Sequence, residues 1–199
     1  LTSSLHPHVT WSVQIDDARE TLAKHGPDRE LPVASIGKLL LLSAVAQLIE
    51  SGELDAEERL AKSTVAAVKD SGLWQHLHEP TLSVDSLAML VGSVSDNLAT
   101  NVLLDHVGLE ACAATAARLR LRHTAMHDIV RDRRDPAVHP ATVASSTAAD
   151  LVALMKTLRS GHLLGPRASA RVIRWLAHGT DHSMVLAPLG LDPLAHGYD

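Results

Sequence analysis

The sequence predicts an α+β fold in which a mainly helical lobe accompanies a small antiparallel sheet. Residues 9–16 alternate between apolar and polar side chains, which is typical of a half-buried strand. Residues 36–49 leave no wide polar face, so they predict a helix that is buried on most sides. Capped helical segments follow as far as Gly179. We therefore expect one domain over residues 1–199, with strands at 1–31, a helical lobe at 32–179 and a lead-in to further strands at 180–199.

The individual elements follow from local signals. The first strand covers Val9 to Asp16 and, after a turn, Glu20 to Lys24 forms the second strand. Pro32 precedes the buried helix, which stops at Gly52 because glycine favours the left-handed conformation after a helix. The other expected helical segments are 60–68, 83–91, 97–108, 109–119, 147–159 and 166–179.

Residues 122–145 show no helical or strand period. The segment contains two prolines and the charged run Arg131-Asp132-Arg133-Arg134-Asp135. Structureless loops of this length are usually functional or mobile. Charged runs of this kind usually form a solvated surface, and we expect that here for Arg131 to Arg134.

Composition excludes several classes of partner. The net charge of −5 argues against nucleic acid. The apolar run is too short for a membrane span and contains Lys38 and Gln47.

Cys112 is the only cysteine, so an internal disulfide is impossible. Because the chain begins at Leu1 rather than Met, we expect a segment upstream of it.

Ser35 and Lys38 lie three positions apart at the start of the buried helix, so their side chains share one face. Burial disfavours the charged form of lysine, so Lys38 could accept the Ser35 proton. The alternative is structural, since serine is a common helix cap and lysine often extends from a buried helix to solvent.

A second motif, Ser95-Asp96-Asn97, stands between two helical segments. Ser-x-x-Lys followed by Ser-Asp-Asn is the signature of class A β-lactamases and penicillin-binding proteins. The chain resembles this family from Thr10 to its end, including the Gly52-Glu53-Leu54 helix exit and the stretch Asp105-His106-Val107-Gly108. The resemblance implies a β-lactamase/DD-peptidase-like fold, of which this sequence contains only the first two strands of the sheet.

The resemblance also implies roles for these residues. Ser35 would be the nucleophile, and its own backbone N–H would form half of the oxyanion hole. Lys38 would accept a proton, Ser95 would pass a proton to the leaving nitrogen, and Asn97 would position the substrate amide and contact Lys38. We expect Asp96 to be structural, hydrogen-bonding backbone at the loop. If the first motif were absent, we would interpret Ser95 and Asp96 as an ordinary helix cap.

Trp74 lies where the family often places an aromatic side chain beside the substrate; the alternative is ordinary packing. One departure concerns the long loop, which in class A β-lactamases holds a glutamate that activates the deacylating water. Residues 122–147 contain no Glu and no Asn. Their carboxylates, Asp128, Asp132 and Asp135, are shorter, and we expect them to be ion-paired and solvated.

Two hypotheses of function remain. The first is a serine hydrolase that opens β-lactam amide bonds through an acyl-enzyme on Ser35. The second is a penicillin-binding or peptidoglycan-related peptidase, esterase or binding module that acylates but deacylates poorly. A purely structural protein leaves the polar set unexplained. The sequence has no Lys-Thr-Gly, which the family carries on a later strand, so we expect that strand beyond Asp199.

We expect neither a metal nor a cofactor. The histidines pair as His6 with His8 and as His76 with His78, and His178 and His182 stand near Asp181, but none has a third ligand at a suitable spacing. The expected partner is a small β-lactam, peptide or ester, with no nucleic acid and no membrane span, and the protein is expected to be a monomer. Its location is open, although the resemblance implies secretion or the periplasm.

Overall fold

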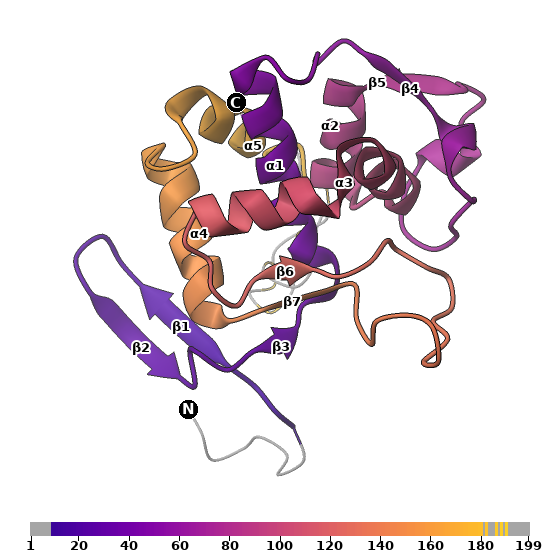
Figure 1. Ribbon diagram of the computed structural model, residues 1–199. Coiled ribbons are helices and arrows are strands. Elements are labelled where there is room, and N and C mark those ends of the chain that lie inside the picture. Colours follow the sequence, from indigo (N-terminus) through magenta and orange to yellow (C-terminus); the bar gives the residue numbers. More distant parts are fainter. Residues whose placement is uncertain (1–8, 181, 183–185, 187, 189, 191–199) are drawn as a thin grey trace.

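The structure is a computed structural model that describes residues 9–180, 182, 186, 188 and 190. The fold combines helices with small antiparallel sheets, as expected. Helix α1 (Lys38–Ser51) runs through the middle of the helical lobe and packs against α2 (Val84–Val94), α3 (Asn97–Arg118) and α5 (Pro166–Leu176), as Figure 1 shows. Helix α4 (Ala148–Ser160) packs against α5.

The helix ends follow the local signals. Gly52 ends α1 in the left-handed conformation, with φ of 78°. The hydroxyl groups of Ser83 and Thr147 accept the backbone N–H groups of Ser86 and Asp150, so they cap α2 and α4. Gly108 interrupts α3 with φ of 80° and ψ of 158°, at the boundary where the sequence predicts one helix to end and the next to begin.

Helix α1 and the turn that precedes it form one apolar stretch, residues 34–51. The expectation that the apolar run is too short for a membrane span is wrong, because residues 34–51 are long and apolar enough by length and composition alone. Half of this stretch, however, is buried inside the protein. Leu40, Leu41 and Leu42 are almost fully buried against the other helices. This placement is that of the core helix of a folded lobe.

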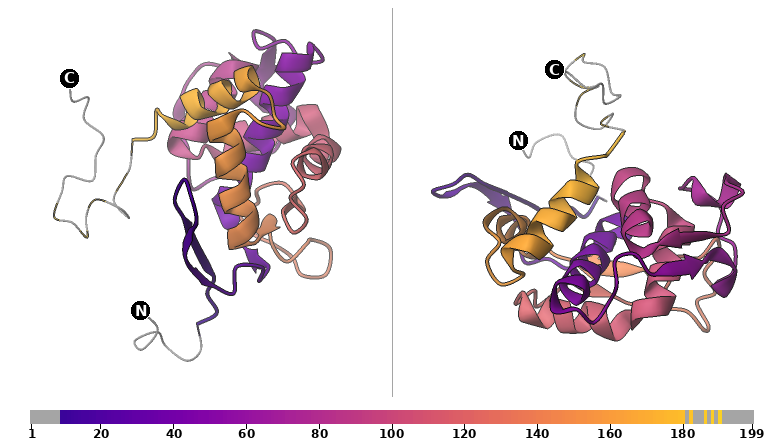
Figure 2. Two further views of the ribbon diagram at one scale, coloured as in Figure 1. Left: turned by 90° about the vertical axis from the view of Figure 1, so that its left-hand side faces the viewer. Right: turned by 90° about the horizontal axis from the view of Figure 1, so that it is seen from above.

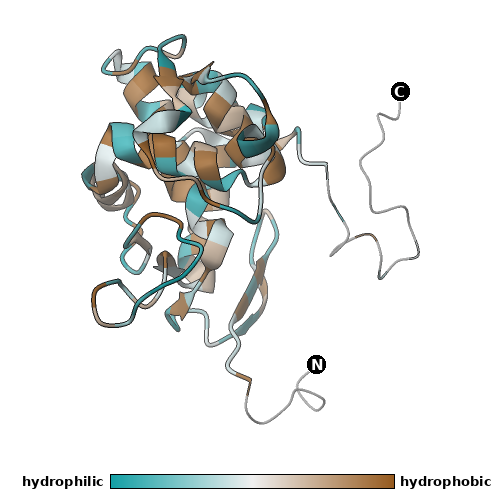
Figure 3. Cartoon of the chain, turned by 90° about the vertical axis from the view of Figure 1, so that its right-hand side faces the viewer, coloured by the Kyte–Doolittle hydropathy of each residue, from teal (hydrophilic) through white to brown (hydrophobic). Residues whose placement is uncertain are grey.

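The β1–β2 hairpin, Val13–Asp16 paired with Thr21–His25, lies at the margin of the helical lobe beside α4 (Figure 2). Both strands were predicted, although β1 begins four residues later than expected. The hairpin exposes Ile15 and Leu22, and apolar colour is visible along it in Figure 3.

Five further strands among the described residues are short and were not predicted. β3 (Leu31–Pro32), β7 (Ala144–Ser146) and β6 (Ala125–Met126) form one antiparallel sheet in the order β3-β7-β6. β4 (Arg59–Ala61) pairs with β5 (Thr81–Ser83). The expected helix over 60–68 is therefore wrong: this stretch contains β4 and the 3₁₀ turn η2 (Lys62–Thr64). Most of 180–199 lies outside the described residues.

Candidate active site

Ser35 stands on a separate 3₁₀ turn, η1 (Ala34–Gly37), directly before α1. The expected α-helical first turn is thus divided between two elements, and Ser35 and Ile36 are exposed while Lys38 is buried. The turn is tightly constrained. Ala34 has a φ of 43°, which is uncommon for a residue other than glycine. Gly37 is so close to β7 that an added Cβ would overlap the Ala144 side chain.

Lys38 connects the two sequence motifs. Its Nζ donates to the Asn97 Oδ1 at 2.7 Å, to the Ser95 Oγ at 2.9 Å and to the Ser95 carbonyl oxygen at 2.7 Å. An ammonium group has three N–H bonds, and these contacts use all of them. The contact between Asn97 and Lys38 was expected from the resemblance. No hydrogen bond joins the Ser35 hydroxyl to Lys38 in the described part of the chain.

The environment of Lys38 favours loss of its proton. The side chain is only 5% exposed, and burial lowers its pKa from 10.5 to about 8, with the charges of Asp96 and Asp70 opposing that shift. Burial disfavours the charged amine because a low-dielectric interior solvates it poorly. Lys38 is therefore far closer to neutrality at physiological pH than an exposed lysine.

Ser95 and Asp96 are positioned by the turn between α2 and α3. Ser95 has a φ of 55° and ends α2 in the left-handed conformation. Asp96 is buried; its carboxylate accepts the backbone N–H groups of Leu73 at 2.7 Å, Trp74 at 2.9 Å and Ala99 at 2.9 Å. The structural role expected for Asp96 is confirmed. It ties the loop before α2 to the start of α3.

Ser35 and Lys38 line one cleft of about 290 Å³. The other walls include Asp70, Asn97, Val130 and Arg131. Ser35, Lys38 and Asn97, which come from two distant motifs, therefore meet at a single concave surface. Ser95 contacts Lys38 but is not among the residues that line this cleft.

Trp74 lies away from this cleft. The side chain is fully buried, and its indole N–H donates to the Glu79 carbonyl oxygen at 2.9 Å. A side chain without solvent access cannot form a wall beside a substrate. The packing alternative therefore describes Trp74, and we do not retain it as a substrate-binding residue.

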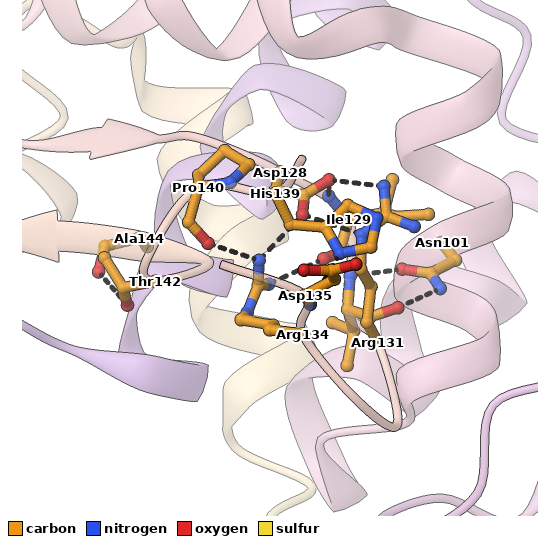
Figure 4. Close-up of polar contacts among 11 residues, drawn as sticks. Asn101, Asp128, Ile129, Arg131, Arg134, Asp135, His139, Pro140, Thr142 and Ala144 are labelled. Carbon is orange, nitrogen blue, oxygen red and sulfur yellow. Dashed lines mark hydrogen bonds and ion pairs between the residues drawn. The ribbon is translucent and has the colours of Figure 1, made fainter. Parts of the chain in front are cut away.

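The loop over 127–143 is organised around Asp128 (Figure 4). Arg131 binds its carboxylate in a bidentate manner at 2.8 and 2.9 Å, and Arg134 adds a contact at 2.7 Å. Arg134 also donates to the carbonyl oxygens of Ile129 and Pro140. Burial raises the pKa of Asp128, but hydrogen bonds from Arg131, Arg134 and the Ile129 N–H outweigh it and hold the pKa at about 2.

This arrangement corrects the expectation of a solvated charged run for Arg131 and Arg134, whereas Arg133 is exposed as expected. Asp128 is ion-paired but 7% exposed, and Arg131 and Arg134 turn inward to it. Asp132 and Asp135 are exposed, and they accept the backbone N–H groups of Lys69 and Ala137 respectively. The charges of the loop therefore hold its fold.

Asn101 is a site residue that the sequence reasoning missed. Its side chain donates to the Val130 carbonyl oxygen and accepts the Val130 N–H, both at 2.8 Å. These two bonds fix Val130 at the wall of the cleft. The position of Asn101, one helical turn after Asn97, was the available signal, because residues four apart share a helix face.

His6, His8 and Asp181 lie outside the described residues. Among the residues that are described, no group of three His, Cys, Asp or Glu side chains is placed to hold a metal ion.

A profile described as the beta-lactamase enzyme family matches residues 6–195. The chain belongs to this family. Over 81 residues, which are 40% of this chain and 26% of the relative, it is 36% identical to the beta-lactamase regulatory protein BlaB of Streptomyces cacaoi.

Solved structures of the β-lactamase class share the fold. The β-lactamase of Sphaerobacter thermophilus is 27% identical, with a TM-score of 0.74 over 84% of this chain and 63% of the other. PBP-A is 22% identical, with a TM-score of 0.70 over 86% of this chain and 62% of the other. The chain thus spans less than two thirds of the length of these relatives.

Proposed function

We propose that this member of the β-lactamase family is a serine hydrolase that opens β-lactam amide bonds through an acyl-enzyme on Ser35. The observation that carries the proposal is the contact of the buried Lys38 amine with both Ser95 and Asn97, in the cleft that Ser35 also lines. A lysine with a lowered pKa beside a serine hydroxyl is the arrangement that activates a serine nucleophile.

In this mechanism the Ser35 Oγ attacks the carbonyl carbon of the lactam, and the hydroxyl proton passes to the neutral amine of Lys38. As an ammonium ion, Lys38 donates three hydrogen bonds. The neutral amine keeps two N–H bonds, so it gives up one of these three hydrogen bonds and gains a lone pair that can accept a proton. As the carbon–nitrogen bond breaks, Ser95 delivers its hydroxyl proton to the ring nitrogen, and the Lys38 ammonium that contacts Ser95 returns the proton taken from Ser35 to the Ser95 oxygen. The Asn97 amide positions the substrate.

The developing oxyanion needs hydrogen-bond donors. The backbone N–H of Ser35 supplies one of them. The family resemblance assigns the other to a strand that carries Lys-Thr-Gly, a motif that these 199 residues lack. Full activity in this proposal therefore requires a second hydrogen-bond donor in addition to the Ser35 N–H.

A second candidate function is a protein that acylates and then holds the acyl group. It is favoured by the cleft wall, where Val130 stands on a loop that contains no glutamate. Asp128, the buried carboxylate of that loop, is bound to two arginines and has a pKa of about 2, so it is a poor base. The partial relative in Streptomyces cacaoi is named as a regulatory protein, which fits a role without rapid turnover.

Intact mass spectrometry after incubation with a penicillin tests these candidates. A stable mass gain of one drug molecule supports acylation with slow release, while consumption of the drug without a lasting gain supports a β-lactamase. Ser35→Ala should abolish labelling and leave the fold intact, as judged by circular dichroism. Labelling that survives this substitution would contradict the assignment of Ser35. Intact drug with unmodified protein would move the proposal to peptide or ester substrates.

A further inference from the structure

Asp70 is an unassigned acidic residue in the cleft of Ser35 and Lys38. It is exposed, and its backbone has a φ of 73°. Positive φ is uncommon outside glycine, although aspartate and asparagine tolerate it better than other residues. Conformations of this kind persist where the surroundings impose them, and they cluster at functional sites.

The neighbours of Asp70 impose this conformation. On one side, the Lys69 N–H donates to Asp132 and its carbonyl oxygen accepts the Asn97 side chain. On the other side, the Ser71 carbonyl oxygen accepts the Asn97 backbone N–H at 3.0 Å. Asp70 is therefore fixed relative to the turn that carries Ser95 and Asn97.

The carboxylate of Asp70 remains free for a ligand. None of the ion pairs or side-chain hydrogen bonds among the described residues involves it. Arg131 and Arg134, the arginines that line the same cleft, are both bound to Asp128. Lys38 is near enough for Asp70 to affect its pKa, but its Nζ is held by Ser95 and Asn97.

We propose that Asp70 binds an ammonium group on the acyl side chain of the substrate. The cleft then prefers β-lactams or peptides that carry a side-chain amine over neutral ones of the same length. This inference rests on the proposed acylation of Ser35. It adds the chemical class of the acyl group, which the Ser35, Lys38, Ser95 and Asn97 set does not determine.

The test uses two penicillins that differ in one group, with 6-aminohexanoyl and heptanoyl side chains. An alkyl amine of this kind stays charged well above pH 8, as lysine does. The rate of Ser35 acylation by each penicillin is measured at pH 8 by quenching and intact mass spectrometry. We expect a preference of about two- to fivefold for the cationic penicillin, which is the range for an exposed ion pair.

Asp70→Asn removes the charge and keeps a residue that tolerates positive φ. We expect this variant to lose the preference. Asp105→Asn makes the same charge change at an exposed position of α3 outside the cleft, and it should keep the preference. The preference should also fall at high salt, which screens exposed charges.

The neutral penicillin separates recognition from an effect on Lys38. Because the charge of Asp70 raises the pKa of Lys38, Asp70→Asn should move the pH profile for the neutral penicillin to lower pH. An equal rate ratio for the two penicillins in the unaltered protein and in Asp70→Asn would overturn the role of Asp70 and leave acylation standing. Failure of both penicillins to label Ser35 would overturn the proposed function and this inference with it.

Discussion

Lys38 is the residue whose charge state governs the proposed chemistry. As an ammonium ion it donates to three acceptors and has no lone pair to accept a proton. Burial lowers its pKa to about 8, so at neutral pH the protonated form still predominates. A general base acts only in its deprotonated form, so the reactive fraction increases as the pH rises.

We therefore expect the rate of acylation by a neutral penicillin to rise with pH, by about tenfold per unit below pH 8, and to level off above it. Quenched reactions between pH 6 and 9.5, analysed by intact mass, would give the profile. Lys38→Met, which keeps the length of the side chain without the amine, should lose both the rate and the rise. A flat profile in the unaltered protein would contradict the role of Lys38 as the base.

Val130 is the second residue that bears on the proposed chemistry, because it stands where the loop over 127–143 borders the cleft. It lines the cleft, and its backbone is held by two hydrogen bonds with Asn101, one donated by the Asn101 amide and one accepted by it. Val130→Glu should place a carboxylate within the cleft, where it can activate a water molecule. We expect the acyl-enzyme to release its drug on the order of 100-fold faster, the usual size of a general-base contribution. Val130→Gln is the control of similar shape, and equal acyl-enzyme lifetimes for the two variants would contradict this explanation.

At the scale of elements, the helices could be predicted because their signals are local. Ser83 and Thr147 cap their own helices, Gly52 and Gly161 end theirs with φ of 78° and 70°, and Pro166 begins α5. Each signal acts within one turn of the residue that carries it. The short strands could not be predicted in this way. Leu31 pairs with Ser146, and strands of two or three residues have no period of their own.

The active site shows the same distinction between local signals and contacts made by distant segments. The motif spacing identified Ser35 and Lys38, but their opposite exposures depend on the packing of η1 against β7. The burial of Trp74 likewise depends on Asp96, which holds the Trp74 backbone from a distant loop. Contacts between segments far apart in the chain leave no periodic pattern in either segment.

Gly37→Ala tests the contact between η1 and β7. The added methyl group would overlap the Ala144 side chain, so we expect a loss of about 1–3 kcal/mol in the free energy of unfolding. Ser35 lies two residues away, and its acylation rate should fall as well.

Gly52→Ala is the control, because its Cβ would meet nothing within 4 Å and its φ of 78° strains only the end of α1. It should cost stability without slowing acylation. Urea unfolding and intact mass measure the two effects, and unchanged acylation in Gly37→Ala would show that η1 tolerates displacement.

At the scale of the whole molecule, α5 completes the core around α1. Trp175 is fully buried, and its indole N–H donates to Asp85, on the first turn of α2. Arg171 and Arg174 on α5 pair with the same carboxylate, at 2.9 and 2.7 Å. Asp85 thus joins two helices that are about 90 residues apart in the chain, through partners from a single face of α5.

Asp85→Ala should therefore lower the free energy of unfolding by about 1–3 kcal/mol, because it leaves the buried Trp175 N–H without its acceptor and removes two ion pairs.

Glu79→Ala is the matched control. Its pair with Arg59 is more than half exposed, and such pairs contribute about 0–1 kcal/mol. Urea unfolding with an unchanged m-value would identify the loss as one of stability. Under native conditions the rate of Ser35 acylation should be the same in both variants, because neither residue lines the cleft. Equal stabilities of the two variants would show that the helical lobe does not depend on the Asp85 contacts.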